Sequence, residues 1–190
     1  MAGSRLSGTK APAKHSCVMK YLYLLGFALP LAAAAPAQAG ELFGGVYVHD
    51  VDTPFTRSGV ENGADVQFGY RGGRIGRTPL QPYVFGALNT AGKTSYAAAG
   101  LSAKFGDRVY VRPGLGIAIH NGSARNVQDP TNHKIEFGSR VLFEPEINLG
   151  VRVSPRATVE ASWVHMSHAR LFGQQNPGID NFGVRLNLGL

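Results

Sequence analysis

Apolar and polar residues alternate with a period of two along most of the chain after residue 40. In the last segment, Phe182, Val184 and Leu186 alternate with Gly183 and Arg185, and the pattern continues to the final residue. The same alternation runs through 109–119 and 141–151. This period predicts β-strands that have one apolar face and one polar or small-residue face. We count eight such strands, at roughly 42–49, 64–71, 81–90, 94–105, 108–120, 139–152, 156–167 and 180–190.

Two all-β folds are compatible with these strands. A soluble sandwich would bury the apolar faces of two sheets against each other. A membrane barrel would turn them toward lipid. Strands of about 11 residues match a bilayer crossing. An even strand count also fits a barrel. So does the alternation of tight and long links between strands. The tight links lie near 106–107 and 153–155, and the long ones near 50–63, 121–138 and 168–179. We therefore predict an all-β, eight-stranded antiparallel transmembrane barrel of the outer-membrane type.

The polar faces of the predicted strands carry charged residues of both signs. A barrel of eight strands has an interior that side chains fill, so these residues should lie inside it. Because an unpaired buried charge is costly, we expect them to pair with one another. The residues concerned are Arg112, Glu144, Glu146, Glu160 and Arg185.

The first 39 residues predict export of the chain. The apolar run 21–39 follows Lys20 and ends in Ala37-Gln38-Ala39, which are the parts of a secretory signal peptide. A membrane-spanning helix is the alternative, and the prolines at 30 and 36 argue against it. We predict cleavage after Ala39, with 1–18 as an extension before Met19 and 40–190 as the barrel domain.

The overall charge suggests anionic partners but does not identify them. The formal net charge is +7, and the single cysteine, Cys17, allows no internal disulfide. Nucleic acid is not an expected partner, because the sequence has no Lys/Arg run and no nucleic-acid-binding motif.

The stretch "HMSHARLFGQQNPGID" (165–180) places polar residues where two predicted strands meet lipid. His165 and Ser167 lie two and four residues after Trp163, so in a strand they share its lipid-facing side. Asp180 lies two residues before Phe182 and shares the lipid-facing side of that strand. If both ends of the barrel domain are periplasmic, this link lies at the extracellular end. A polar group on the lipid-facing surface is expensive unless it is paired or functional. The three side chains should therefore project outward together.

Serine, histidine and a carboxylate are the three groups of a nucleophilic hydrolase. Ser167 would attack a carbonyl, His165 would take its proton, and Asp180 would orient the imidazole. The alternative is that these are ordinary polar residues above the membrane rim. His168 has the opposite parity and is expected in the loop or the interior, where it would contact substrate. Nothing pairs His120 and His133 into a metal site.

At these residues the sequence resembles the lipid A 3-O-deacylase (PagL) family of Gram-negative outer membranes. The matching segments are "HMSHA", "NPGID" and the final alternating strand; the family pattern is His-x-Ser-Asn-Ala, then Asn-x-Gly-Ile-Glu. The resemblance implies that His165 is the base, Ser167 the nucleophile and Asp180 the acid. It further implies that Asn176 helps to shape the site.

The sequence departs from this pattern at three positions. The acid is Asp180 instead of Glu, His168 replaces Asn, and Arg170 replaces Gly. Oxyanion or substrate contacts are assigned to His168, Arg170 and Asn176, with backbone N–H groups around 168–170 as the oxyanion donors. Arg170 and other loop cations, such as Arg125 and Lys134, are candidates for binding phosphates.

The expected function is hydrolysis of the 3-O-linked 3-hydroxyacyl ester of lipid A. The site would face the outer leaflet of a Gram-negative outer membrane, and the reaction needs neither cofactor nor metal. The expected partners are lipid A, the outer-membrane lipids and, as an open alternative, a second copy of the chain in a homodimer. The competing interpretation is a non-enzymatic small barrel, such as an adhesin or a structural protein. A porin is disfavoured, because eight strands leave no aqueous pore.

Overall fold

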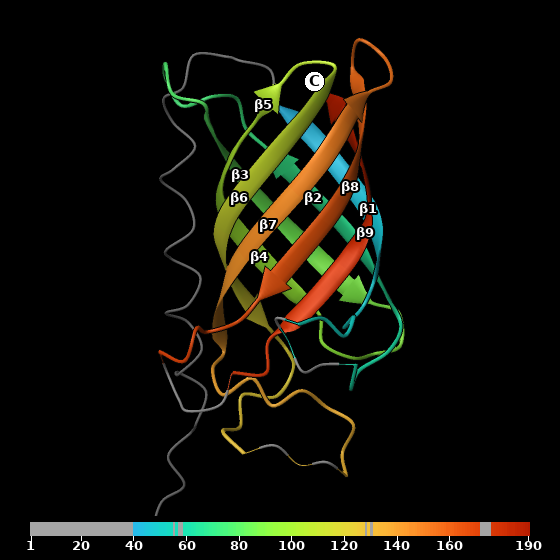
Figure 1. Cartoon of the computed structure of the whole chain (residues 1–190), viewed down its shortest axis with the longest axis vertical. Helices are drawn as coiled ribbons and strands as arrows, with labels where there is room; N and C mark the ends of the chain where they lie inside the picture. The colour runs from blue at the N-terminus through green and yellow to red at the C-terminus, as the bar shows by residue number, and fades with distance from the viewer. Residues whose placement is uncertain (1–39, 55, 57–58, 128, 130, 172–175) are drawn as a thin grey trace, which may run out of the picture. The chain divides into compact units, whose positions relative to one another are not determined.

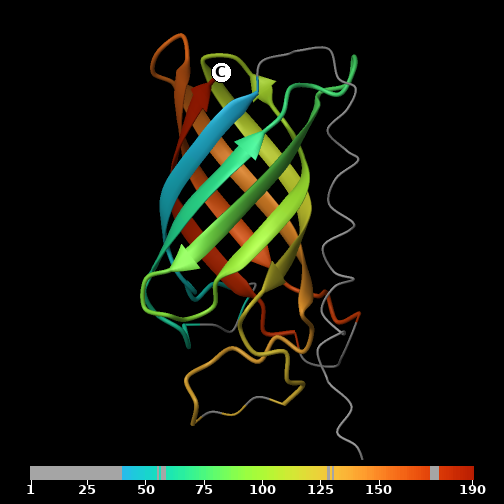
Figure 2. The same ribbon diagram turned by 180° about the vertical axis from the view of Figure 1, so that it is seen from behind.

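The computed structural model describes residues 40–54, 56, 59–127, 129, 131–171 and 176–190, all within one compact unit. Its regular elements are strands, which wind around a barrel (Figures 1 and 2). The strands are β1 (Glu41–Val48), β2 (Ala64–Arg71), β3 (Leu80–Asn89), β4 (Tyr96–Ala103), β5 (Phe105–Gly106), β6 (Val109–His120), β7 (Val141–Arg152), β8 (Ala157–Met166) and β9 (Ile179–Gly189). In this part of the chain, no helix has the length and hydropathy needed to cross a bilayer. The predicted N-terminal extension and signal peptide, 1–39, lie outside the described residues.

All neighbouring strands are antiparallel, and the pairing of β4 with β6 closes the sheet. The short strand β5 continues β4 in the same register, since Ser102 pairs with Gly114 and Phe105 pairs with Val111. The break lies where Pro113, which has no N–H to donate, stands on the opposite strand. Eight barrel strands are therefore confirmed. The single strand predicted at 94–105 is corrected to two pieces, which begin at Tyr96.

The alternation read from the sequence matches the two faces of the barrel wall. On β9, Phe182 and Val184 are 42% and 60% exposed. Arg185, the next residue after Val184, is fully buried. On β6, Leu115 and Ile117 are likewise exposed, and Ala118 is buried. A largely apolar outer surface over an interior that holds charged side chains is the arrangement that a membrane barrel requires.

Inside the barrel, the charged side chains form a connected network. Arg185 Nη2 lies 2.8 Å from Glu146 Oε2, and Arg112 Nη1 lies 2.9 Å from Glu160 Oε1. Glu144 accepts a hydrogen bond from the Tyr83 hydroxyl. The predicted interior pairing is thus confirmed for Arg112, Glu146, Glu160 and Arg185, whereas the hydrogen bond of Glu144 is with a tyrosine and not with a charged residue. Such pairing offsets the cost of removing them from water.

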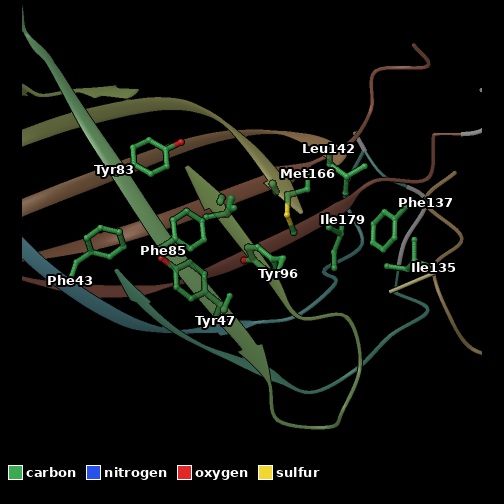
Figure 3. Close-up of a cluster of buried hydrophobic side chains, with 14 residues drawn as sticks. Phe43, Tyr47, Tyr83, Phe85, Tyr96, Ile135, Phe137, Leu142, Met166 and Ile179 are labelled. Carbon is green, nitrogen blue, oxygen red and sulfur yellow. The ribbon is translucent and has the colours of Figure 1, made fainter. Parts of the chain in front are cut away.

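The connections gather at two ends of the barrel. At one end, here called the loop end, lie the described residues of the connections 49–63, 90–95, 121–140 and 167–178. The opposite end holds the C-terminus and the connections 72–79, 107–108 and 153–156 (Figure 1). Figure 3 shows Ile135 and Phe137 packing near Leu142, Met166 and Ile179 at the loop end. This apolar layer supports the connections above it and the ends of β8 and β9.

Candidate active site

The candidate site lies at the loop end of β8 and β9, on the outer surface of the wall. His165 and Asp180 are direct register partners across these strands. Ser167 follows β8 and pairs with Phe143, with backbone hydrogen bonds of 2.8 and 3.1 Å. Directly opposed residues project from the same face of a sheet. The register therefore places all three predicted residues on one side of the wall.

The three side chains form a continuous chain of contacts. His165 Nε2 lies 3.0 Å from Ser167 Oγ, and His165 Nδ1 lies 2.9 Å from Asp180 Oδ1. With the proton on Nδ1, the imidazole donates to the carboxylate and Nε2 accepts the serine O–H. This is the order of contacts that activates a serine nucleophile.

Asp180 is fully buried rather than in contact with lipid. Trp163 Nε1 donates to Asp180 Oδ1 at 2.8 Å, and the Thr56 hydroxyl donates to Oδ2 at 2.9 Å. The Thr53 hydroxyl also donates to Oδ2. Sequence reasoning missed these three donors. Trp163 was indicated only as a lipid-facing residue of the same strand as His165. The two threonines gave no signal, because nothing local in the sequence links the β1–β2 connection to β9.

The three further residues predicted for the site lie in and beside the turn after Ser167. The His168 N–H donates to Asn176 Oδ1 at 2.9 Å, and the His168 side chain is fully buried. Ala169 and Arg170 have φ values of 52° and 61°, and the Leu171 N–H closes the turn onto His168 O. Left-handed backbone at two consecutive non-glycine residues is strained, a feature that gathers at functional sites. Arg170 is exposed.

The other two loop cations singled out from the sequence belong to a different connection. Arg125 and Lys134 line a polar pocket of about 400 Å³ together with residues of the 90–95 connection. Arg125 also lies 3.8 Å from Glu136. The structure therefore does not bring these two residues together with the serine, histidine and aspartate.

A buried ionic cluster anchors the connection that covers Asp180. His49 Nδ1 lies 2.9 Å from Asp65 and Nε2 lies 3.1 Å from Glu61. Burial acts to lower the pKa of His49, but the hydrogen bonds and charges of these carboxylates outweigh it and raise the pKa to about 9. Burial acts to raise the pKa of Glu61, but hydrogen bonds from His49 and from the Thr94 and Ile135 backbone lower it to about 2. Glu61 thus joins three connections of the loop end.

An apolar groove runs along the outer wall beside the site. Its volume is about 530 Å³. It is lined by Val111, Ile147, Leu149, Ala161, Ser162, Trp163, Phe182 and Gly183. Trp163 therefore contributes its ring to the groove while its N–H contacts Asp180. The groove suits an acyl chain held near Ser167. No cluster of three or more His, Cys, Asp or Glu side chains suited to a metal occurs among the described residues.

Comparison with known proteins identifies a matching family. The family model for lipid A 3-O-deacylase (PagL) matches residues 69–188, a range that includes His165, Ser167 and Asp180. No curated protein matches the sequence.

Solved structures share the fold at low sequence identity. The crystal structure of the outer membrane enzyme PagL has a TM-score of 0.51 and 19% identity, covering 79% of this chain and 99% of that one. Neisserial surface protein A (NspA) has a TM-score of 0.52 and 10% identity, covering 80% and 97%. A de novo designed transmembrane β-barrel has a TM-score of 0.52 and 11% identity, covering 82% and 98%.

Proposed function

The chain belongs to the lipid A 3-O-deacylase (PagL) family, and from this premise we propose that it is a serine esterase of the outer membrane. Its substrate would be lipid A, and the bond cleaved would be the ester of the 3-O-linked 3-hydroxyacyl chain. The observation that carries the proposal is the pair of contacts that His165 makes, with Ser167 on one ring nitrogen and Asp180 on the other.

In the proposed reaction, Ser167 Oγ attacks the ester carbonyl while its proton passes to His165 Nε2. The tetrahedral intermediate collapses as the C–O bond to the sugar breaks, and His165 returns the proton to the departing sugar oxygen. Water then attacks the acyl-enzyme with His165 again as base, and the 3-hydroxy fatty acid leaves. Asp180 stays ionised and stabilises the imidazolium.

The oxyanion formed on the carbonyl needs N–H donors close to Ser167. The His168 N–H already donates to Asn176, so we assign this role to the N–H groups of Ala169 and Arg170. The two residues share a positive φ and directly follow His168 in the turn. Preorganised donors of this kind typically contribute about 3–4 kcal/mol to transition-state stabilisation.

The position of the site supports access from the membrane rather than from the barrel interior. The groove next to Trp163 is apolar and lies on the lipid-facing wall, so an acyl chain would reach Ser167 without leaving a hydrocarbon environment. Arg170 is exposed, which supports its proposed role in binding a lipid A phosphate. We propose that the loop end faces outward from the cell and the site faces the outer leaflet.

The test is the mass spectrum of lipid A incubated with purified protein in mixed micelles. The wild type should remove one 3-hydroxyacyl unit, and Ser167→Ala should lower the rate by at least about a thousandfold. Ser102→Ala is the matched control, because Ser102 is a buried strand serine on β4. Unchanged lipid A with both wild type and Ser167→Ala would favour the non-enzymatic barrel, and equal deacylation by both would contradict the role of Ser167.

A further inference from the structure

The β1–β2 connection supplies two of the hydroxyl groups that contact Asp180. We infer that Thr53 and Thr56, together with Trp163, are positioning residues that hold Asp180 in the orientation His165 requires. This inference rests on the proposed function, because it assigns the residues a role in the same reaction. In this role they act through the acid.

The hydrogen bonds of Asp180 explain why the three residues are needed. An ionised carboxylate has about four acceptor positions on its two oxygens. Among the described residues, four side chains donate to Asp180: His165 and Trp163 to Oδ1, and Thr53 and Thr56 to Oδ2. Burial of a charge without such donors costs several kcal/mol, so these contacts compensate for the water that Asp180 has lost.

The two threonines lie in a segment that is anchored close to Asp180. The Val51 N–H donates to the backbone carbonyl of Asp180 at 2.8 Å, and the Asp50 N–H donates to Asn181 Oδ1 at 2.9 Å. The Asp50 carboxylate also accepts the N–H groups of Val60 and Glu61, each at 2.8 Å. The segment is therefore fixed on both sides of the threonines, and their hydroxyls are held in place before substrate binds.

Gly178 leaves the space that Thr56 occupies. A Cβ atom at position 178 would lie 2.9 Å from Thr56 Cγ2 and 3.3 Å from His165 Cε1. The φ of this glycine is also positive, at 62°, a region that other residues rarely adopt. The glycine of the "NPGID" segment thus leaves room for the threonine to contact the acid.

The test compares two double variants of the threonines. Thr53→Val with Thr56→Val keeps the side-chain shape but removes both hydroxyls, which leaves Oδ2 without these donors. Thr53→Ser with Thr56→Ser keeps both hydroxyls. On lipid A, the valine variant should lose about 10- to 100-fold in kcat with KM within about twofold, because displacement of a catalytic group affects the chemical step. The serine variant should recover most of the wild-type kcat.

The same assay separates failure of this inference from failure of the proposed function. All variants are first checked for the heat-dependent electrophoretic mobility of a folded barrel. If Ser167→Ala is inactive and the folded valine variant keeps the wild-type kcat, the positioning role is overturned while the function stands. A loss confined to KM, or an equal loss in the serine variant, also overturns it. Activity that survives Ser167→Ala overturns both.

Discussion

His165 and Asp180 occupy directly opposed positions on β8 and β9, with their Nδ1 and Oδ1 atoms 2.9 Å apart. Opposed residues on antiparallel strands have Cβ atoms about 4.5–5.5 Å apart. Over this distance the short aspartate side chain reaches the imidazole, although the family pattern has the longer glutamate. The register of the sheet therefore sets the contact, and the donors around Asp180 maintain it.

Replacement of this acid by its amide should impair catalysis while leaving the barrel folded. Asp180→Asn keeps the size of the side chain, but its NH₂ group favours the wrong imidazole tautomer. We expect kcat for lipid A deacylation to fall about 10³- to 10⁴-fold. Asp107→Asn, in the exposed turn that pairs with Arg152, is the control. An Asp180→Asn enzyme within tenfold of wild type would show that the acid does not orient His165.

Filling the apolar groove should weaken substrate use. Ala161 is an outward-facing residue that lines the groove beside Trp163, so Ala161→Trp would occupy the space proposed for an acyl chain. We expect kcat/KM to fall about tenfold or more, since a few buried methylene groups at about 0.8 kcal/mol each account for such a loss. Ala99→Trp adds the same ring to the outward face of β4. Similar effects from both changes would argue against a specific groove.

The loop-end cluster predicts how stability changes with pH. The pKa of His49 is raised from 6.5 to about 9. Its contribution to stability is therefore complete below about pH 6.5 and is lost as the pH rises through about 9. The apparent Tm in detergent should fall by roughly 5–10 °C between pH 7 and pH 10. In His49→Gln this segment of the pH curve should be flat. A wild-type Tm that does not change over this range would contradict the ion pairing.

The interior network predicts coupling between two barrel residues. Arg185→Met would leave Glu146 buried without its 2.8 Å partner, and we expect a loss of about 3–5 kcal/mol in unfolding free energy. Adding Glu146→Leu should restore part of this loss, because the uncompensated charge is removed. The fluorescence of Trp163, the single tryptophan, reports unfolding in lipid vesicles. A double variant no more stable than the single one would rule out this coupling.

Much of the fold could be predicted from the sequence because a membrane barrel imposes strict alternation. Leu115 faces outward and Arg185 faces the interior. Because apolar and polar residues alternate along each strand, the sequence shows which side chains face which way. The interruption at Lys104 could not be foreseen, since it depends on Pro113 of the paired strand. The shift from predicted 139–152 to Val141–Arg152 has a local cause, because the Ser139 hydroxyl bonds to the backbone of Val141.

The outward triad could be placed from parity, but the surroundings of its acid could not. His165 and Ser167 lie two residues apart, so strand geometry alone relates them. Thr53 and Thr56 reach Asp180 from more than 120 residues away in the sequence. No periodic pattern specifies a contact made by an irregular connection. The same holds for the burial of Asp180, which follows from that connection and not from the strand itself.

The account depends most directly on whether Ser167 is a nucleophile activated by His165. A long-chain alkyl fluorophosphonate supplied in detergent micelles would label such a serine, and peptide mass spectrometry would locate the label. We predict modification of the peptide that carries Ser167, a loss of labelling of at least about a hundredfold in His165→Ala, and unchanged labelling in Ser102→Ala. Absence of label at Ser167, or labelling of His165→Ala at the wild-type rate, would contradict the account.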